Sequence, residues 1–184
     1  MYDCEHSMRL FVSIEVPSNV RQKLLALRED IPISNAALTQ PHCTLCFIGE
    51  TPESQLSEII AKLSTVKFKP FQITAQGIGV FPSLQNPRVV WVGLHSQDSQ
   101  ELTKLAQDIR TVLNLPQEDF VGHCTLTRLK PSEVSEKTRK MLKKYEKNSF
   151  GVFPVTSFEL KQSVFHTGKA VHIVLKTFKN TVFV

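Results

Sequence analysis

The chain has no apolar stretch that approaches the roughly 20 residues needed to cross a lipid bilayer, and its first residues lack the basic and then apolar order of a signal peptide. Only 7 of its 184 residues are glycine, and no glycine-rich phosphate loop of the nucleoside triphosphate or dinucleotide type is present. No Gly-x-Ser-x-Gly motif marks a serine nucleophile, and no acidic cluster is available to hold magnesium. We therefore expect a cytoplasmic protein with no membrane partner and no bound cofactor.

Cysteine is also scarce. The four cysteines are Cys4, Cys43, Cys46 and Cys124, and three of them lie in or beside apolar strand patterns, which indicates reduced thiols and not a disulfide scaffold. Cys43 and Cys46 form a Cys-x-x-Cys pair, but residues three apart on a regular strand point to opposite faces, and no second pair follows. We therefore predict no metal site.

The charge balance is mildly basic, with 22 Lys and Arg residues against 17 Asp and Glu residues and a formal net charge of +5. This excess is compatible with a phosphate-bearing partner but is far below that of a protein that coats nucleic acid. One expected helix carries a basic run that has two interpretations: a solvated helix face, which is the commoner case, or a track for an RNA backbone. The run consists of Lys137, Arg139, Lys140, Lys143, Lys144 and Lys147.

The tetrapeptide His-Cys-Thr-Leu occurs twice, at residues 42–45 and 123–126. Residues i and i+2 of an extended strand point the same way, so each copy directs an imidazole and a hydroxyl to one place. One imidazole can accept a proton while the other donates one, and the hydroxyls of Thr44 and Thr125 can donate hydrogen bonds to phosphate oxygens. The repeat therefore predicts a paired site in which His42 and His123 are catalytic.

The order of the expected elements repeats as well. Apolar periodicity and turn signals predict strands over 9–16, 42–49, 71–80, 88–95, 122–129, 153–164 and 170–178, with helices that begin near residues 18, 51, 98 and 131. Phe11 and Val92, in the opening strand of each half, precede the histidine of that half by the same 31 positions. This equal offset indicates an internal duplication of a strand-helix-strand-helix unit, and we expect both His strands to meet at one central groove.

Strand parity suggests which cysteine lies near this groove. On a regular strand Cys46 shares a face with His42 and Thr44, so we expect it to border the site. By the same parity Cys43 and Cys124 point into the core.

Other basic side chains are weighed for a role in the site. Arg128 lies at the end of the second His strand, where a guanidinium can bind a phosphate in two places at once. His166 lies in an expected turn and is a candidate substrate contact at the border of the site. His95 and His172 lie in or beside strand patterns without any repeated context, so we interpret them as structural.

Two His-x-Thr-Leu motifs in a duplicated chain of helices and strands resemble the two-histidine (2H) phosphoesterase superfamily, and within it the RNA 2′,3′-cyclic phosphodiesterases of the LigT-like, or 2′-5′ RNA ligase-like, type. The segments that carry the resemblance are 8–12, 41–50, 81–83, 87–93 and 122–129, which follow the family's order across nearly the whole chain after residue 8. There are two departures. Members often carry a basic residue at the position of Cys46, and an aromatic residue commonly precedes the first motif, where residues 36–39 offer none.

The resemblance implies an α+β, bilobal fold of duplicated strand-helix-strand-helix units with antiparallel sheets around a central cleft. It implies metal-independent hydrolysis of an RNA-terminal 2′,3′-cyclic phosphate to a 2′-phosphate by His42 and His123. It also implies that Thr44 and Thr125 hold phosphate oxygens and that Arg128 matches a family arginine. The partners are then RNA or oligonucleotide ends that bear the cyclic phosphate, bound by a monomer. We expect residues 1–7 to be a disordered extension and residues 8–184 to be a single domain of two pseudo-symmetric lobes.

In the mechanism that we expect, a neutral imidazole takes a proton from the attacking water while a protonated imidazole gives one to the leaving ribose oxygen. We assign His123 as base and His42 as acid, although neither the residues nor the resemblance fixes that choice, and we expect both to titrate near their ordinary pKa of about 6.5. The alternatives are a 2H enzyme that acts on 2′-5′-linked oligonucleotides or a cyclic ADP-ribose phosphate, or that joins tRNA halves, and a non-catalytic nucleotide-binding module.

Overall fold

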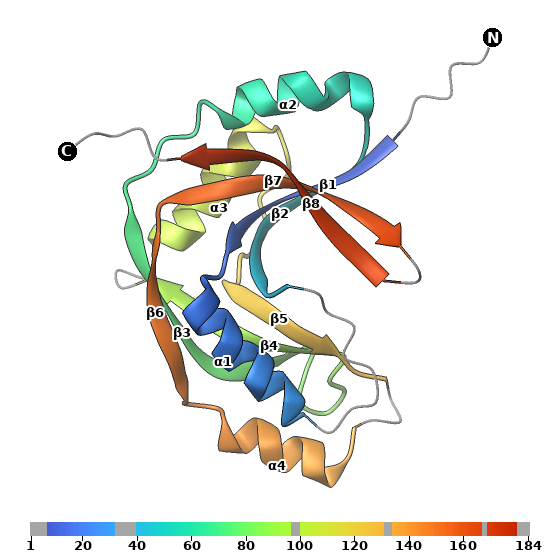
Figure 1. Ribbon diagram of the computed structural model, residues 1–184, viewed down its shortest axis with the longest axis vertical. Coiled ribbons are helices and arrows are strands. Elements are labelled where there is room, and N and C mark those ends of the chain that lie inside the picture. The colour runs from blue at the N-terminus through green and yellow to red at the C-terminus, as the bar shows by residue number, and fades with distance from the viewer. Residues whose placement is uncertain (1–6, 32–39, 97–99, 131–133, 167–168, 180–184) are drawn as a thin grey trace.

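The computed structural model describes residues 7–31, 40–96, 100–130, 134–166 and 169–179. Strands and helices alternate along them much as the sequence predicts (Figure 1). The strands are β1 (Ser7–Glu15), β2 (His42–Pro52), β3 (Phe71–Phe81), β4 (Val89–Ser96), β5 (His123–Arg128), β6 (Ser149–Val155), β7 (Ser157–His166) and β8 (Lys169–Lys179). The helices are α1 (Ser18–Glu29), α2 (Leu56–Leu63), α3 (Glu101–Val112) and α4 (Glu136–Lys144), and a 3₁₀ turn at Glu53–Gln55 precedes α2.

The eight strands of the described residues form one antiparallel sheet in the order β6-β3-β4-β5-β2-β1-β7-β8. The two His strands, β2 and β5, are neighbours at its centre, where Cys43 with Cys124 is the one residue pair that links them in the described ranges. The sheet therefore consists of two four-stranded halves that meet at this pair (Figure 1). This arrangement confirms the expected α+β fold and the meeting of the two His strands.

Each half of the sheet uses strands from both repeats of the sequence. β3 follows the first His strand but pairs with β4 and β6, whereas β7, near the end of the chain, pairs with β1. The helices cross over in the same way, since α1 packs on β5 and β6 and α3 packs on β2 as well as on β4. The two repeats are therefore interlocked, and neither builds a half of the sheet alone.

Two boundaries differ from those that the sequence predicts. The single strand expected over 153–164 is two strands, because the chain leaves the half that contains β3 after Val155 and enters the half that contains β1 at Ser157. The extension expected over 1–7 reaches one residue too far, since Ser7 begins β1 and pairs with Pro52, while residues 1–6 lie outside the described residues.

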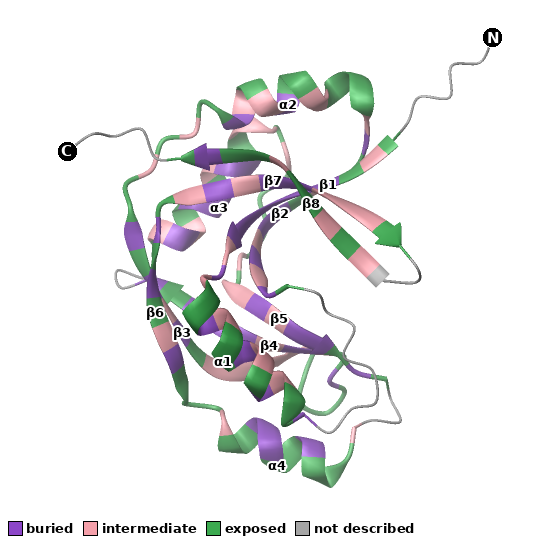
Figure 2. Cartoon of the chain, viewed as in Figure 1, coloured by how far each residue is buried: buried purple, intermediate pink, exposed green. Residues whose placement is uncertain are grey.

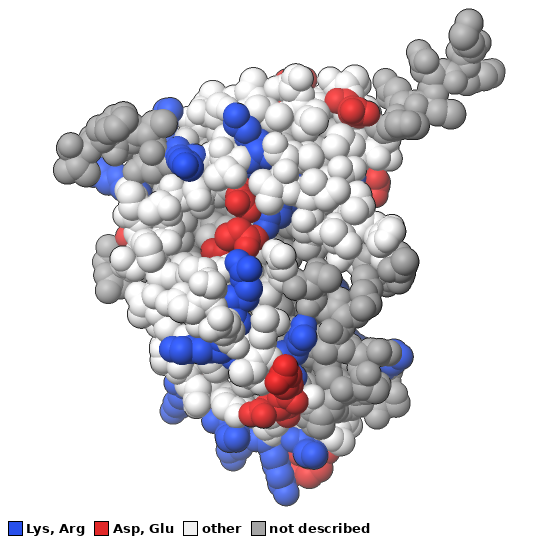
Figure 3. All heavy atoms as spheres, in the orientation of Figure 1, with Lys and Arg blue, Asp and Glu red and all other residues white. Residues whose placement is uncertain are grey.

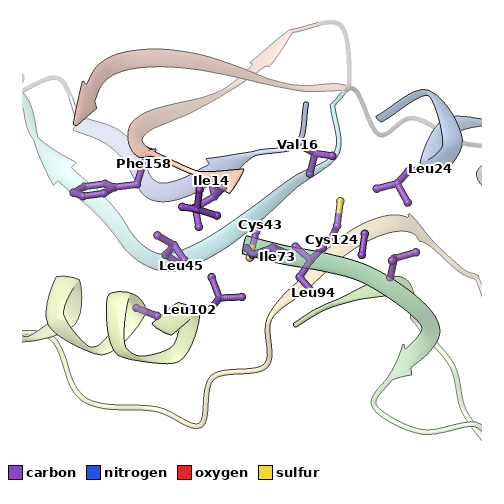
Figure 4. Packing of buried hydrophobic residues seen from close by; sticks show 14 of the residues in the cluster. Ile14, Val16, Leu24, Cys43, Leu45, Ile73, Leu94, Leu102, Cys124 and Phe158 are labelled. Carbon is purple, nitrogen blue, oxygen red and sulfur yellow. The ribbon is translucent and has the colours of Figure 1, made fainter. Parts of the chain in front are cut away.

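The core lies between the sheet and the helices that cover it, where buried residues gather on the inner sides of the elements (Figure 2). Helix α1 contributes Val20, Leu24 and Leu27, whose spacing places them on one side of a helix. Cys43 and Cys124 lie at the centre of the core with no exposed surface, as expected from strand parity (Figure 4). None of the helices in the described ranges has the length and apolar character that a membrane crossing requires.

Candidate active site

The pairing of Cys43 with Cys124 places the two His-Cys-Thr-Leu copies side by side. Residues that pair across neighbouring strands share a face of the sheet, and here both thiols point into the core. The residues before and after each cysteine therefore point to the opposite face. This face carries four partly exposed side chains, which are His42, Thr44, His123 and Thr125.

Both imidazoles are held by the same hydrogen bond. Nδ1 of His42 lies 2.9 Å from the carbonyl oxygen of Gln40, and Nδ1 of His123 lies 2.7 Å from that of Val121. A carbonyl can only accept, so the hydrogen of each neutral ring sits on Nδ1 and donates to it. In both residues Nε2 is then the atom that accepts or carries the proton for chemistry.

The first tetrapeptide contains a β-bulge at Leu45. Thr44 pairs with Ser13 and Cys46 pairs with Val12, so the leucine between them is the extra residue of β2. Cys46 therefore turns to the core side with Val12 and is only 2% exposed. Regular strand parity therefore does not hold beyond Leu45, although Cys46 still borders the cavity, as predicted.

The second tetrapeptide has the same bulge, at Leu126. Thr125 pairs with Trp91 and Thr127 pairs with Val90, so the strand resumes its alternation one residue later. The residues that return to the site face are Phe47 in the first copy, paired with Phe11, and Arg128 in the second, paired with Val89. Each follows its histidine by five positions.

A cavity of about 390 Å³ opens on this face. Its lining includes five side chains that the sequence singled out, which are Thr44, Cys46, His123, Thr125 and Arg128. It also includes an exposed aromatic ring that the sequence did not suggest, since Phe47 is 70% exposed. The part of the wall before β5 is acidic and aromatic, with Glu118, Asp119 and Phe120.

Two of the expected residues do not line the cavity. His42 lies beside it, with its ring centroid 5.4 Å from that of Phe11 and 5.1 Å from that of His172, which meets it edge to face. His166 is exposed at the end of β7, where it pairs with Lys169, and it is not among the residues around the cavity. The structure thus gives no contact between His166 and the other site residues.

The surroundings of His42 favour its neutral form. Burial, aided by the positive charges of His172 and Lys161, lowers the pKa of His42 to about 4, against the opposing effects of the Gln40 carbonyl and the Glu15 carboxylate. Burial also lowers the pKa of His172. His42 is therefore a neutral proton acceptor at pH 7, which departs from the ordinary pKa near 6.5 that we expected for both imidazoles.

Sequence reasoning missed the charged groups next to His42. Lys161 on β7 is 3% exposed and forms ion pairs with Glu15 and, at 3.2 Å, with Glu159. Glu15 also pairs with Arg21 at 3.2 Å. Glu159 and Lys161 are two positions apart on β7, and therefore on one face of the strand, which is the signal that could have revealed the cluster. His172, interpreted from the sequence as structural, belongs to the same neighbourhood.

His123 lies instead among aromatic rings. Its ring is 5.1 Å from that of Phe81, edge to face, and 5.9 Å from that of Trp91. The indole reaches this position because β3 has a glycine beneath it: a Cβ on Gly79 would lie 2.2 Å from two carbons of the Trp91 ring. No group of three or more His, Cys, Asp or Glu side chains in the described ranges is placed to hold a metal ion.

Comparison with known proteins places the chain among phosphoesterases. The sequence model of the family described as LigT like Phosphoesterase matches residues 14–91. A protein of Archaeoglobus fulgidus named RNA 2′,3′-cyclic phosphodiesterase is 35% identical over 182 residues, which cover 94% of this chain and 100% of that protein. One of the same name from Aquifex aeolicus is 31% identical over 145 residues, which cover 74% of this chain and 76% of that protein.

Solved structures share the fold. The crystal structure of E. coli LigT in apo form matches with a TM-score of 0.76 and 24% identity, over 96% of this chain and 99% of that one. The crystal structure of a Thermus thermophilus protein, TT0787, matches with a TM-score of 0.74 and 26% identity, over 94% of this chain and 97% of that one.

Proposed function

The chain belongs to the LigT-like phosphoesterase family, and from this premise we propose that it hydrolyses the 2′,3′-cyclic phosphate at the end of an RNA to a 2′-phosphate, without a metal ion. The relatives from A. fulgidus and A. aeolicus are named for an activity on this group. The observation that carries the proposal is the placement of two imidazoles on one face of the sheet, each with Nδ1 bound to a carbonyl and Nε2 left for proton transfer.

The two imidazoles have different tasks in the proposed reaction. Nε2 of His42 takes a proton from water while the water oxygen bonds to phosphorus, and protonated His123 gives its Nε2 proton to the ribose 3′ oxygen as the bond between that oxygen and phosphorus breaks. The products are a 2′-phosphate and a free 3′ hydroxyl. The lowered pKa of His42 supports its assignment as base, which reverses the assignment that we made from the sequence.

The remaining site residues bind the substrate in this proposal. The hydroxyls of Thr44 and Thr125 and the guanidinium of Arg128 donate to the non-bridging phosphate oxygens, where negative charge builds in the transition state. Fixed donors of this kind supply the charge stabilisation without a metal ion. The exposed ring of Phe47, on the same cavity wall, offers a flat apolar surface against which a nucleobase can stack.

Incubation with a nucleoside 2′,3′-cyclic phosphate in EDTA tests the proposal. We expect conversion to the nucleoside 2′-phosphate alone, identified by chromatography against the 2′ and 3′ isomers. Loss of turnover in EDTA that one added metal restores would contradict the metal-free mechanism, and a 3′-phosphate product would contradict the stated bond cleavage. Tight binding of the nucleotide without turnover would instead identify a binding module.

A further inference from the structure

Most of the excess of positive charge lies in α4 and the residues that directly follow it. From Glu136, the first residue of α4, to Lys147 there are six basic and two acidic residues, whereas the chain contains 22 and 17, so all other residues together carry 16 basic and 15 acidic residues. All six basic side chains of this segment are exposed. Figure 3 shows Lys and Arg side chains gathered at the lower end of the molecule, where Figure 1 places α4.

The fold of α4 keeps these charges in solvent. Ser135 and Thr138 form a capping box at the start of the helix, and Thr138, Met141 and Leu142 form its buried side. The basic residues cover most of the rest of the surface, which also carries the exposed carboxylates of Glu136 and Glu146. Among the described residues, no carboxylate forms an ion pair with any of the six. A strong positive field therefore remains for a partner to neutralise.

This helix is tied to the rim of the cavity. Nη1 of Arg139 donates to the carbonyl oxygen of Leu84 at 2.5 Å, in the segment that links β3 to β4. That segment begins after Phe81, which lines the cavity and packs against His123. At its other end, the carbonyl of Arg88 accepts a hydrogen bond of 2.8 Å from the backbone N–H of the residue that follows Arg128. The segment between β3 and β4, which is flanked by the cavity residues Phe81 and Val89, thus connects the edge of the cavity to α4.

We propose that the basic surface of α4, formed by the six basic residues of 137–147, binds the single-stranded RNA that precedes the reacting end. This inference rests on the proposed function, in which the cavity holds the terminal nucleotide. A solvated helix face would not need to collect +4 of the chain's net charge of +5 next to a segment that borders the cavity. A polyanion whose end lies in the cavity would pass this rim, and each contact of a lysine with a phosphate releases a counterion.

Two substrates distinguish RNA binding by the α4 surface from the hydrolysis of the cyclic phosphate in the cavity. One is a nucleoside 2′,3′-cyclic phosphate, and the other is an oligoribonucleotide of about ten nucleotides with the same end. The test variant replaces Lys137, Lys140 and Lys143 with Gln, which removes three charges and preserves helix propensity. Its control replaces three exposed lysines outside the α4 surface, namely Lys69, Lys176 and Lys179, with Gln.

For the α4 variant we expect kcat/KM on the oligoribonucleotide to fall about tenfold at low salt, and the slope of log kcat/KM against log salt to become shallower by about two. Its kcat/KM on the nucleoside should stay within twofold of wild type, and the control variant should match wild type on both substrates. Circular dichroism melting confirms that both variants fold, and the single change Lys143→Glu supplies a second, milder test with the same expected direction.

Other outcomes overturn the proposal. An unchanged oligoribonucleotide rate and salt slope would show that α4 does not touch RNA, and an equal loss in the control variant would show a general charge effect. If wild type turned over neither substrate, the proposed function would fail. Fluorescence anisotropy with the same oligoribonucleotide would then test whether the α4 surface binds RNA, because the α4 variant should bind it more weakly than wild type. Binding of anionic vesicles by wild type, lost in the α4 variant while RNA binding is kept, would assign the surface to lipid.

Discussion

At the scale of residues, His42 and His123 share one hydrogen-bonding pattern and differ in their neighbours. Nδ1 of each ring donates to a carbonyl two residues earlier, so both rings present Nε2 in the same way. His42 lies near Lys161 and the ring of His172, whereas His123 lies against Phe81 and Trp91. Two identical tetrapeptides could not reveal this difference, because it comes from strands β3, β4, β7 and β8.

The lowered pKa of His42 predicts a pH dependence of stability. The imidazole titrates near 6.5 in the unfolded chain and at about 4 in the folded one. Above pH 6.5 it is neutral in both states, so it does not make the free energy of unfolding depend on pH. As the pH falls from 6.5 to 4, the unfolded state binds the proton first, and the free energy of unfolding falls by up to about 3 kcal/mol. Denaturant unfolding at several pH values should show that His42→Gln removes this loss. If the free energy of unfolding fell equally with pH in wild type and in His42→Gln, the lowered pKa of His42 would be contradicted.

The two threonines are expected to act through their hydroxyls. Thr44→Val and Thr125→Val keep a β-branched side chain on the strand but remove the donor to a charged phosphate oxygen, so kcat/KM should fall roughly 10- to 100-fold in each. The matched variants Thr44→Ser and Thr125→Ser retain the hydroxyl and should keep most of the activity. Melting temperatures verify that stability changes little. Equal kinetics for the Val and Ser variants would mean that the hydroxyls do not contact the phosphate.

At the scale of elements, the sequence predicted most helices and strands because their apolar periodicity is regular. It failed where that periodicity is interrupted. The bulges at Leu45 and Leu126 shift the alternation by one residue, so Cys46 is buried where it borders the cavity, and the exposed ring of Phe47 joins it there. Bulges depend on the partner strand, whose register a single sequence does not show. The break at Thr156 was hidden for a related reason, since two strands of different halves follow each other directly.

Strand β3 supports the second histidine through Gly79. Replacement by Ala would bring a Cβ to 2.2 Å from the Trp91 ring, so the indole must move away from the position in which it packs near His123. We expect Gly79→Ala to lower the free energy of unfolding by about 1–3 kcal/mol, the usual cost of overpacking, and to reduce turnover. The double variant with Trp91→Phe has a smaller ring and should recover part of the stability, which a double-mutant cycle measures. Strictly additive losses would show that Gly79 and Trp91 are not coupled.

At the scale of the whole molecule, the duplication brings two distant segments together. The repeat of His-Cys-Thr-Leu and the equal offsets predicted that both histidines meet, and the sheet order confirms that β2 and β5 are neighbours. The exchange of β3 and β7 between the two halves was not predictable, because strands of similar composition can pair in several orders. This exchange positions Phe81 and Lys161 near the histidines, and it explains why these two residues were missed.

The central claim is that His42 and His123 act together in one chemical step. The most direct test is kcat/KM for a nucleoside 2′,3′-cyclic phosphate in wild type, His42→Ala, His123→Ala and the double variant, with folding checked by circular dichroism. We expect each single variant to lose at least about 100-fold, the low end of the effect of a general acid or base. The double variant should lose little more, because groups that act as a unit are not additive. Retention of more than a tenth of the wild-type rate by either single variant, or multiplication of the two losses in the double variant, would contradict the account.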